Sequence, residues 1–275
     1  MMALIASEWE RLWNRKITWF LFAMIPVILF VSGQYYQKSN QGLTPENPAY
    51  AVLDNFPVLV LAEQLMIGFN LMLLLLLVFS VTEEYRTGQI RMVMIRSYSF
   101  SQLLFAKWLT VMEVMLLFHV TYLILSYGFG AWMFDSTSQL LLFYHDEPVS
   151  HGPAFFYVLR YYALAFVTLI AISSIMTFIA VISQSTTTAI GGTIGFLLVS
   201  AGYPTILQKF AQTMEPRPDP HWYFLSITQI QYEGIALALA PHSRFVLFNT
   251  GVLFAYAFIF GVAAHLIFTK KDRFI

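Results

Sequence analysis

Among the ionisable side chains inside the long apolar runs of this sequence, four stand out as candidates for intramembrane polar pairs. They are Glu63, Glu113, Arg160 and His265. A charge buried in hydrocarbon is costly, so such a residue marks either a transport pathway or a partner of opposite charge. Glu63 comes six residues after Pro57, and Arg160 comes six after Ala154, which places both about 9 Å inside one membrane boundary at about 1.5 Å per helical residue. We therefore predict that Glu63 and Arg160 pair.

Glu113 and His265 form a second candidate intramembrane polar pair, at a similar expected depth near the opposite boundary. Asn70 and Asn249 are expected deeper in the membrane. Two roles remain open for these polar residues. They line a gate or pathway, or they pair and fix the register between helices, and we favour the second role.

The sequence contains none of the common motifs for catalysis or nucleotide binding. It lacks a P-loop, the H-E-x-x-H zinc motif, the G-x-S-x-G nucleophile motif and a glycine-rich dinucleotide fingerprint. It has no cysteine, and its six histidines are scattered without the spacing of metal ligands. We therefore expect no catalytic residue, no metal site and no cofactor in this chain, and an intramembrane enzyme is the least favoured interpretation.

The composition is that of a membrane protein. Of the 275 residues, 58% are hydrophobic and 11% are charged, which lies outside the range of ordinary soluble domains. Six apolar runs are long enough to cross about 30 Å of hydrocarbon as helices. These runs are residues 17–35, 57–81, 109–134, 155–182, 188–207 and 245–268. Because they are continuously apolar rather than alternating, we predict an all-α polytopic membrane protein, with residues 1–275 forming a single transmembrane domain.

The distribution of basic residues predicts the orientation of the spans. The 15 Lys and Arg balance the 15 Asp and Glu, so the net charge gives no indication of a nucleic-acid partner. Basic residues concentrate in the cytoplasmic connections of membrane proteins. With the N-terminus in the cytoplasm, ten basic residues lie on that side and four on the other. This asymmetry favours a cytoplasmic location for both termini.

Two segments outside the spans are expected to form helices. No small-residue cleavage site follows the N-terminal residues, so we expect them to be retained. Trp9, Leu12 and Trp13 fall at helical spacing between charged residues, which predicts a helix in the membrane interface at about residues 5–16; simple flanking charge is the alternative. The long extracytoplasmic segment at about 208–244 has room for one or two short helices at the outer surface.

The longest cytoplasmic connection, at about residues 83–108, contains the charged stretch EEYRTGQIRMVMIRS. Apolar Ile90 and Val93 are interleaved there with Arg91 and Arg96. This pattern predicts an amphipathic helix on the inner face of the membrane. It leaves two roles open, which are adhesion to the membrane surface and docking of a cytoplasmic partner.

This segment and the six-span layout resemble the permease subunits of bacterial ABC-2 type transporters, such as the sodium-efflux, bacitracin-resistance and lantibiotic-immunity permeases. In that family the first cytoplasmic connection carries an acidic residue, a Gly-Thr or Thr-Gly step, a hydrophobic helix, a break and then a lysine. The matching positions here are Glu83, Glu84, Thr87, Gly88, residues 90–95, residues 97–99 and Lys107. The break lacks the usual proline, and Phe100 stands near a position where a basic residue is common.

The resemblance implies a permease subunit of an ATP-driven exporter in the bacterial cytoplasmic membrane, without an ATPase site of its own. A second permease copy would complete the pathway, and two cytoplasmic ATPase subunits would bind ATP and Mg. The short link at 183–187 would be a second contact with the ATPase. The first ATPase-coupling contact would consist of Glu83, Glu84, Thr87, Gly88, Arg91 and Arg96.

Two questions remain open at this stage. The spans are rich in Phe, Leu and Met, which suits a hydrophobic or amphipathic cargo such as a peptide or antibiotic, although lipid-facing helices have the same composition. The alternative function is an ion-gradient-driven secondary transporter. Such a protein needs a membrane-embedded acid with broken helices around it, and Glu113 is the residue that fits this requirement.

Overall fold

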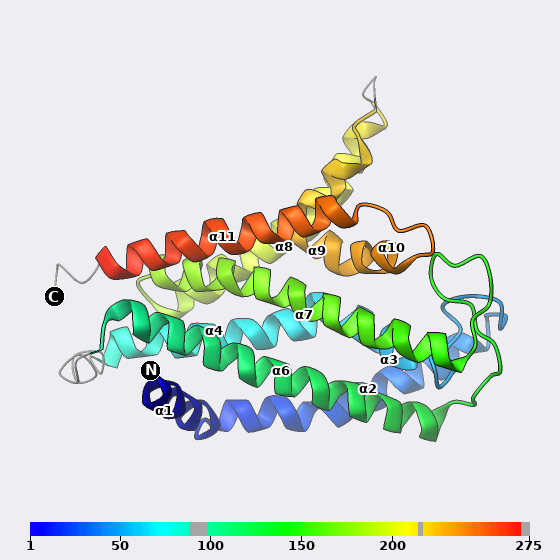
Figure 1. Ribbon diagram of the computed structural model, residues 1–275, viewed down its shortest axis with the longest axis horizontal. Helices are drawn as coiled ribbons and strands as arrows, with labels where there is room; N and C mark the ends of the chain where they lie inside the picture. Colours follow the sequence, from blue (N-terminus) through cyan, green and yellow to red (C-terminus); the bar gives the residue numbers. More distant parts are fainter. Residues whose placement is uncertain (88–97, 214–216, 271–275) are drawn as a thin grey trace.

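The computed structural model is helical along most of the chain that it describes (Figure 1). It describes the backbone of residues 1–87, 98–213 and 217–270, and the side chains of the same ranges except for 83–87. Most helices lie side by side along one long axis, with loops gathered at one end of the bundle, and the yellow C-terminal part of α8 (Thr186–Ala211) projects away from it. The N-terminal helix α1 (Met2–Trp13) and the end of the last described helix, at Lys270, lie at the opposite end.

Six helical spans are long and apolar enough to cross a membrane, so the protein is an all-α polytopic membrane protein. The prediction of six spans is confirmed. The ends of the helices differ from the expected ends by a few residues, except that the third span begins clearly earlier than expected. Five of them are single helices: α2 (Lys16–Asn40), α6 (Phe100–Met133), α7 (His151–Ile182), α8 (Thr186–Ala211) and α11 (Val246–Lys270). The second span consists of α3 (Phe56–Gln64), the π-helical turn η1 (Leu65–Phe69) and α4 (Asn70–Thr87).

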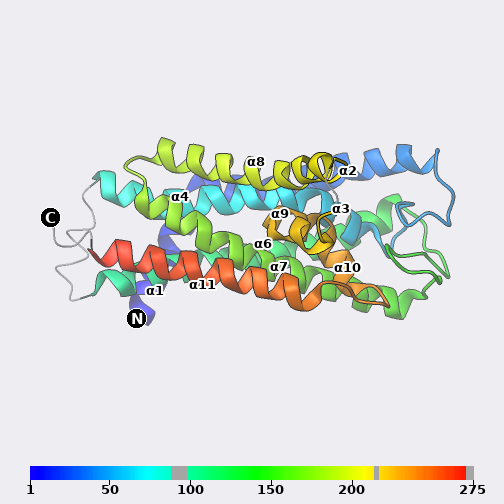
Figure 2. The ribbon, with the colours of Figure 1, turned by 90° about the horizontal axis from the view of Figure 1, so that it is seen from above.

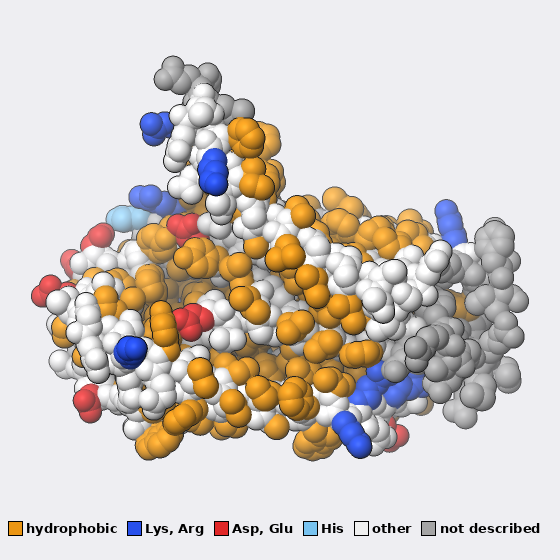
Figure 3. Space-filling model, turned by 180° about the vertical axis from the view of Figure 1, so that it is seen from behind, with side chains coloured by type: hydrophobic (Ala, Val, Ile, Leu, Met, Phe, Trp, Pro, Cys, Tyr) orange, Lys and Arg blue, Asp and Glu red, His pale blue; other side chains and the backbone are white. Residues whose placement is uncertain are grey.

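The spans differ strongly in how much of their surface is covered by the rest of the chain. Within their most apolar windows, 67% of the second span and of α7 is buried, against 17% of α8 and of α11. α7 packs against α4 and α11 and forms the middle of the bundle. Hydrophobic side chains also cover the middle of the face in Figure 3, and most charged side chains there lie toward the two ends. The peripheral helices α2, α8 and α11 therefore face lipid or another protein.

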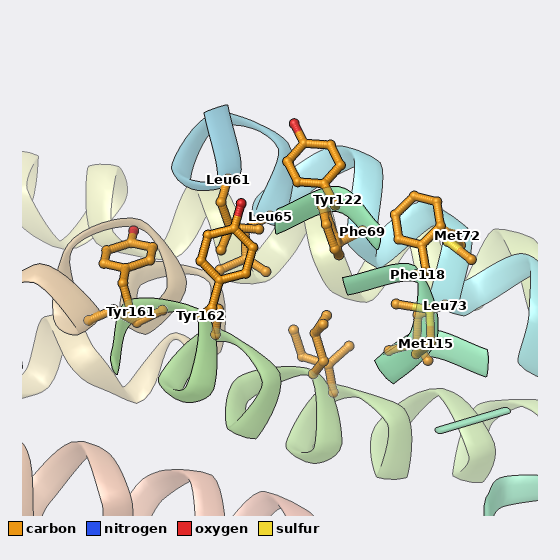
Figure 4. Close-up of a cluster of buried hydrophobic side chains, with 14 of the residues drawn as sticks. Leu61, Leu65, Phe69, Met72, Leu73, Met115, Phe118, Tyr122, Tyr161 and Tyr162 are labelled. Carbon is orange, nitrogen blue, oxygen red and sulfur yellow. The ribbon is translucent and has the colours of Figure 1, made fainter. Parts of the chain in front are cut away.

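The core between the second span, α6 and α7 is filled by large side chains (Figure 4). Phe69 meets the rings of Phe118 and Tyr122 edge-on, with ring centroids 5.2 and 5.1 Å apart. Leu61 and Leu65 are fully buried beside them. Because lipid tails are as apolar as leucine, this close packing, rather than escape from water, holds such helices together.

The start of α6 is fixed by its sequence. Ser99 accepts a hydrogen bond from the backbone N–H of Gln102 at 3.2 Å, and the Gln102 side chain accepts one from the N–H of Ser99 at 3.1 Å. This reciprocal arrangement is a capping box, which satisfies two unpaired donors at a helix N-terminus. The third span therefore begins at Phe100, so residues 100–108, which we expected in the cytoplasmic connection, belong to its helix.

We expected the segment between α8 and α11 to form short helices at the outer surface. Part of it is instead buried in the bundle. It contains η2 (Pro220–Leu225), α9 (Ile227–Gln229), the π-helical turn η3 (Ile230–Gly234) and α10 (Ile235–Leu239). α9 and α10 lie between α8 and α11 (Figure 2), and Ile227, Ile230 and Gln231 are buried. The segment enters the bundle and leaves it on the same side, as a re-entrant element does.

We call the end of the bundle that holds α1 the inner end and the opposite end the outer end, following the charge asymmetry of the sequence. The cytoplasmic location of the inner end remains a prediction. Because the chain has no cysteine, single cysteines can be placed at exposed Asn14 and Glu46 without background labelling. We expect a membrane-impermeant maleimide to label Glu46→Cys in intact cells and Asn14→Cys only after permeabilisation. The reverse pattern would contradict the orientation.

Candidate functional site

The candidate site is a cavity in the outer half of the bundle, with a volume of about 510 Å³. We call it the outer cavity. Its walls come from α2, α3, η1, α7, η3, α10 and the loop of residues 134–150. Two acidic and five aromatic side chains line it: Tyr36, Glu63, Phe143, Tyr144, Tyr161, Tyr232 and Glu233.

Glu63 lies on the wall of the outer cavity at the C-terminal end of α3. Its carboxylate accepts a hydrogen bond from the Tyr36 hydroxyl at 2.9 Å. Arg160 is exposed on α7, and the ion pairs of the described residues include none between Glu63 and Arg160. The predicted pair is therefore wrong. The two residues were placed at one depth, but depth does not determine the direction in which a helix presents a side chain.

Glu233, on the opposite wall, was not singled out in the sequence. Its carboxylate accepts hydrogen bonds from the Tyr144 hydroxyl at 2.7 Å and from the Gln229 amide at 2.8 Å. Burial and, after it, the hydrogen bond from Tyr144 to Glu233 raise the pKa of Tyr144 to about 12, so its hydroxyl stays a proton donor. Tyr144 has a φ of 62°, a conformation that bulky residues rarely adopt. The loop thus holds this side chain at the cavity at some cost in backbone strain.

The second predicted pair is not formed either. Glu113 is exposed on α6, and His265 is exposed on α11. The His265 ring lies 3.5 Å from the Ser101 hydroxyl. Within the described part of the chain, no hydrogen bond or ion pair joins Glu113 to His265.

Asn70 belongs to a buried polar cluster that pins the re-entrant segment to the bundle. Its amide donates to Gln231 at 2.8 Å and to the Met66 carbonyl at 3.0 Å. The Gln231 amide donates back to Asn70 and on to the Thr168 hydroxyl, each at 3.2 Å. All four amide hydrogens are thus used, and the cluster joins η1, α4, α7 and η3. Gln231 is completely buried, although Asn70 was the only member of this cluster that we expected deep in the membrane.

Asn249 is also buried, at 5% exposure, as its expected depth suggested. Its side-chain oxygen and nitrogen have no hydrogen-bond partner among the described residues. Its amide nitrogen lies 2.9 Å from the point where a Cβ would stand on Gly234. A side chain at position 234 would collide with Asn249, so glycine lets η3 approach α11.

At the inner end, α1 is tied to α6 by an ion pair that sequence spacing could not indicate. Lys107 donates to Glu8 at 2.9 Å, and both side chains are only 2% exposed. Arg11 lies 3.2 Å from the other oxygen of Glu8. The interfacial helix was expected at about residues 5–16 and occupies Met2–Trp13 instead.

The predicted coupling contact lies almost entirely outside the described residues. Glu83, Glu84 and Thr87 belong to the backbone of α4, but their side chains are not described. Gly88, Arg91 and Arg96 fall within residues 88–97, which are not described. Their proposed role stays a prediction.

The outer cavity is suited to binding rather than to covalent chemistry. Its acids are held by hydroxyl and amide donors, and most of its remaining wall is aromatic or aliphatic. Among the residues with described positions, no group of three or more His, Cys, Asp or Glu side chains could hold a metal ion. Concave and largely apolar sites with a few placed polar groups are typical of small-molecule binding.

Comparison of the sequence with curated proteins gave no match. A protein-family model, in contrast, covers nearly the whole chain, from the first residues of α2 to the tail after α11. The chain belongs to the family described as "Protein of unknown function (DUF2705)", whose model matches residues 19–274.

Proposed function

We propose that this chain is the membrane-spanning permease subunit of an ATP-driven ABC-2 type exporter in the bacterial cytoplasmic membrane. Two permease subunits form the translocation pathway, and two separate cytoplasmic ATPase subunits bind and hydrolyse ATP with Mg. The cargo is a hydrophobic or amphipathic compound such as a peptide or antibiotic. This chain has no ATPase site, and its part in the cycle is mechanical.

The observation that supports the proposal is the proximity of two residues, Thr82 and Thr186, that adjoin or belong to the two expected ATPase contacts. The hydroxyl of Thr82 lies 3.0 Å from that of Thr186. Thr82 directly precedes Glu83, where the coupling segment begins, and Thr186 lies within the short link 183–187. Both contacts therefore start from one place at the inner end, where a single ATPase surface can reach them.

α6 supplies a mechanical path from that end to the outer cavity. It begins at Phe100, shortly after the coupling segment, and runs without a break to Met133. Its 34 residues correspond to a length of about 51 Å. The helix is followed by the loop 134–150, which contributes Phe143 and Tyr144 to the outer cavity. A displacement of the coupling segment would therefore be carried to the cavity wall.

The exposed spans support pairing with a second permease subunit. α8 is covered over only 17% of its apolar window, and a Cβ added at Gly191, Gly195 or Gly202 would meet nothing within 4 Å. Small residues on such a face allow a neighbouring helix to approach closely. In the proposal, this surface of α8 faces the partner permease.

The test is an affinity pull-down of the tagged chain from mild detergent, with ATPase activity measured on the eluate. Wild type is expected to recover a soluble ATPase. The Gly88→Pro, Arg91→Glu double variant is expected to lose at least about 90% of it, because proline breaks a helix and the charge reversal opposes docking. Arg217→Glu, the same charge reversal in the outer segment, is the matched control and should retain the ATPase. An eluate of folded wild type without any ATPase would contradict the proposal.

A secondary transporter driven by an ion gradient is the second candidate. One observation favours it: the second span is interrupted by the π-helical turn η1, directly after Glu63 at the outer cavity. Interrupted helices beside a membrane-embedded acid are typical of such transporters. Glu113, exposed on α6, is then the further acid to test. Recovery of the chain alone, with ion-dependent uptake abolished by Glu113→Gln, would favour this candidate.

A further inference from the structure

The outer cavity has an unbalanced negative charge. Glu63 and Glu233 line it, and none of its lining residues is Lys, Arg or His. The hydrogen-bond donors to these two carboxylates are neutral, namely the hydroxyls of Tyr36 and Tyr144 and the amide of Gln229. In the described ranges, the ion pairs involve Glu8, Asp54 and Asp219 but neither acid of the cavity. The charge that would complete this site is a cation from outside the chain.

The rest of the wall indicates what kind of cation fits. Four tyrosines and Phe143 line the outer cavity, and aromatic faces attract cations, most strongly where water is excluded. Val58, Leu59 and Ile67 add aliphatic surface. A small inorganic ion prefers six or more converging oxygen ligands. The wall of the outer cavity does not offer such a set. An occupant with an apolar body and a positive centre matches both parts of the lining.

The volume agrees with this class of ligand. Pockets for drug-sized ligands have volumes of about 300–1,000 Å³, and the outer cavity has about 510 Å³. A second cavity, of about 600 Å³, shares the wall formed by Tyr144, Tyr232 and Glu233 but also contains Arg244. Glu233 therefore also lines a cavity that contains a basic residue. Of these two cavities, Glu63 lines the outer cavity alone. We expect Glu63 to contribute more to cation binding.

We propose that the outer cavity is a binding site for organic cations with an aromatic or aliphatic body, whose positive charge lies against Glu63 and Glu233. The inference narrows the class of cargo. It rests on the proposed function only in treating the bound cation as a cargo. Binding itself requires no ATPase, so it can be measured on the isolated chain.

The experiment uses two probes of nearly equal size and shape and opposite charge, the tetraphenylphosphonium cation and the tetraphenylborate anion. Binding of each to the purified chain in lipid nanodiscs is measured by equilibrium dialysis, with empty nanodiscs subtracted. We expect saturable binding of the phosphonium and none of the borate. Glu63→Gln should weaken phosphonium binding at least about tenfold, a loss that corresponds to about 1.4 kcal/mol, and Glu233→Gln should weaken it less.

Two further variants separate a site in the cavity from unspecific effects. Ala62→Leu keeps both charges but fills part of the outer cavity, and it should also weaken binding at least about tenfold. Glu46→Gln removes an exposed acid of the loop after α2 that does not line the cavity, and it should leave binding unchanged. Each variant is compared with wild type by its thermal unfolding temperature, so that loss of binding is counted only in folded protein.

Three outcomes would overturn the inference: absence of phosphonium binding to folded wild type, equal binding of the borate, and equal affinity of wild type and Glu63→Gln. These outcomes are independent of the pull-down test. Phosphonium binding by a chain that recovers no ATPase would keep the site and reject the exporter. Recovery of an ATPase by a chain that binds no phosphonium would keep the exporter and reject the site.

Discussion

Replacement of Glu8 by leucine is expected to lower the free energy of unfolding by about 3–5 kcal/mol. Lys107 and Glu8 are both 2% exposed and lie 2.9 Å apart. Removing the carboxylate leaves the ammonium group buried without this partner, and a buried charge that loses its counter-charge is strongly destabilising. The measurement is unfolding by SDS titration from mild-detergent micelles, followed by tryptophan fluorescence, since Trp9 and Trp13 lie on the same helix.

The chain offers a matched control for this substitution. Glu10→Leu makes the same change on an exposed position of the same helix, and we expect an effect within about 0.5 kcal/mol. The double variant Glu8→Leu, Lys107→Met should recover most of the loss, because a buried ion pair replaced by apolar residues of similar size is often neutral. Equal effects of Glu8→Leu and Glu10→Leu would show that the ion pair does not hold α1 to α6.

Replacement of Gln231 by leucine is expected to lower the free energy of unfolding by about 1–3 kcal/mol. The substitution removes the donor to the buried Asn70 amide oxygen, and an unsatisfied buried polar group costs its full desolvation penalty. The Asn70 amide nitrogen keeps only its bond to Met66, and the Thr168 hydroxyl keeps only its bond to the Ala165 carbonyl. It should also loosen the re-entrant segment. Since the chain has no cysteine, Ile235→Cys, at a buried position, reports this loosening as faster labelling by a maleimide.

Two comparisons make this prediction specific. Gln212→Leu changes an exposed glutamine and should alter neither stability nor the labelling rate at position 235. Asn70→Leu combined with Gln231→Leu removes both amides, and we expect it to be more stable than Gln231→Leu alone. Unchanged labelling in the Gln231→Leu background would mean that apolar packing, not the amide cluster, holds the segment in place.

The sequence was sufficient to predict the helices that cross the membrane, because length and apolarity decide that property. It did not reveal the re-entrant segment. α9, η3 and α10 together span only residues 227–239 and include Gln231 and Glu233, so they are too short and too polar to be recognised as a span. On sequence alone, a polar residue such as Gln231 indicates an exposed loop. Only its hydrogen bonds to Asn70 explain how it can be buried.

The candidate sites were harder to predict for a geometric reason. Residue counting gave similar depths for Glu63 and Arg160, but pairing also needs both side chains to face each other, which requires the rotation of each helix about its axis. The partner of Glu63 is Tyr36 on α2, a residue that counting along the sequence did not single out. Glu8 and Lys107 lie 99 residues apart in the chain, so only their tertiary contact identifies them as a pair.

The length of the central helices makes the protein sensitive to bilayer thickness. α6 has 34 residues and α7 has 32, which correspond to about 51 and 48 Å, whereas the hydrocarbon layer measures about 30 Å. The excess is accommodated by tilt or by ends that stand in the headgroup region. Glu63 on α3 and Tyr161 on α7 lie toward the outer end of the bundle, so longer acyl chains would bring the hydrocarbon boundary closer to the outer cavity. Lipid chain length thereby sets whether the outer cavity lies beside the headgroup region or beside the hydrocarbon layer.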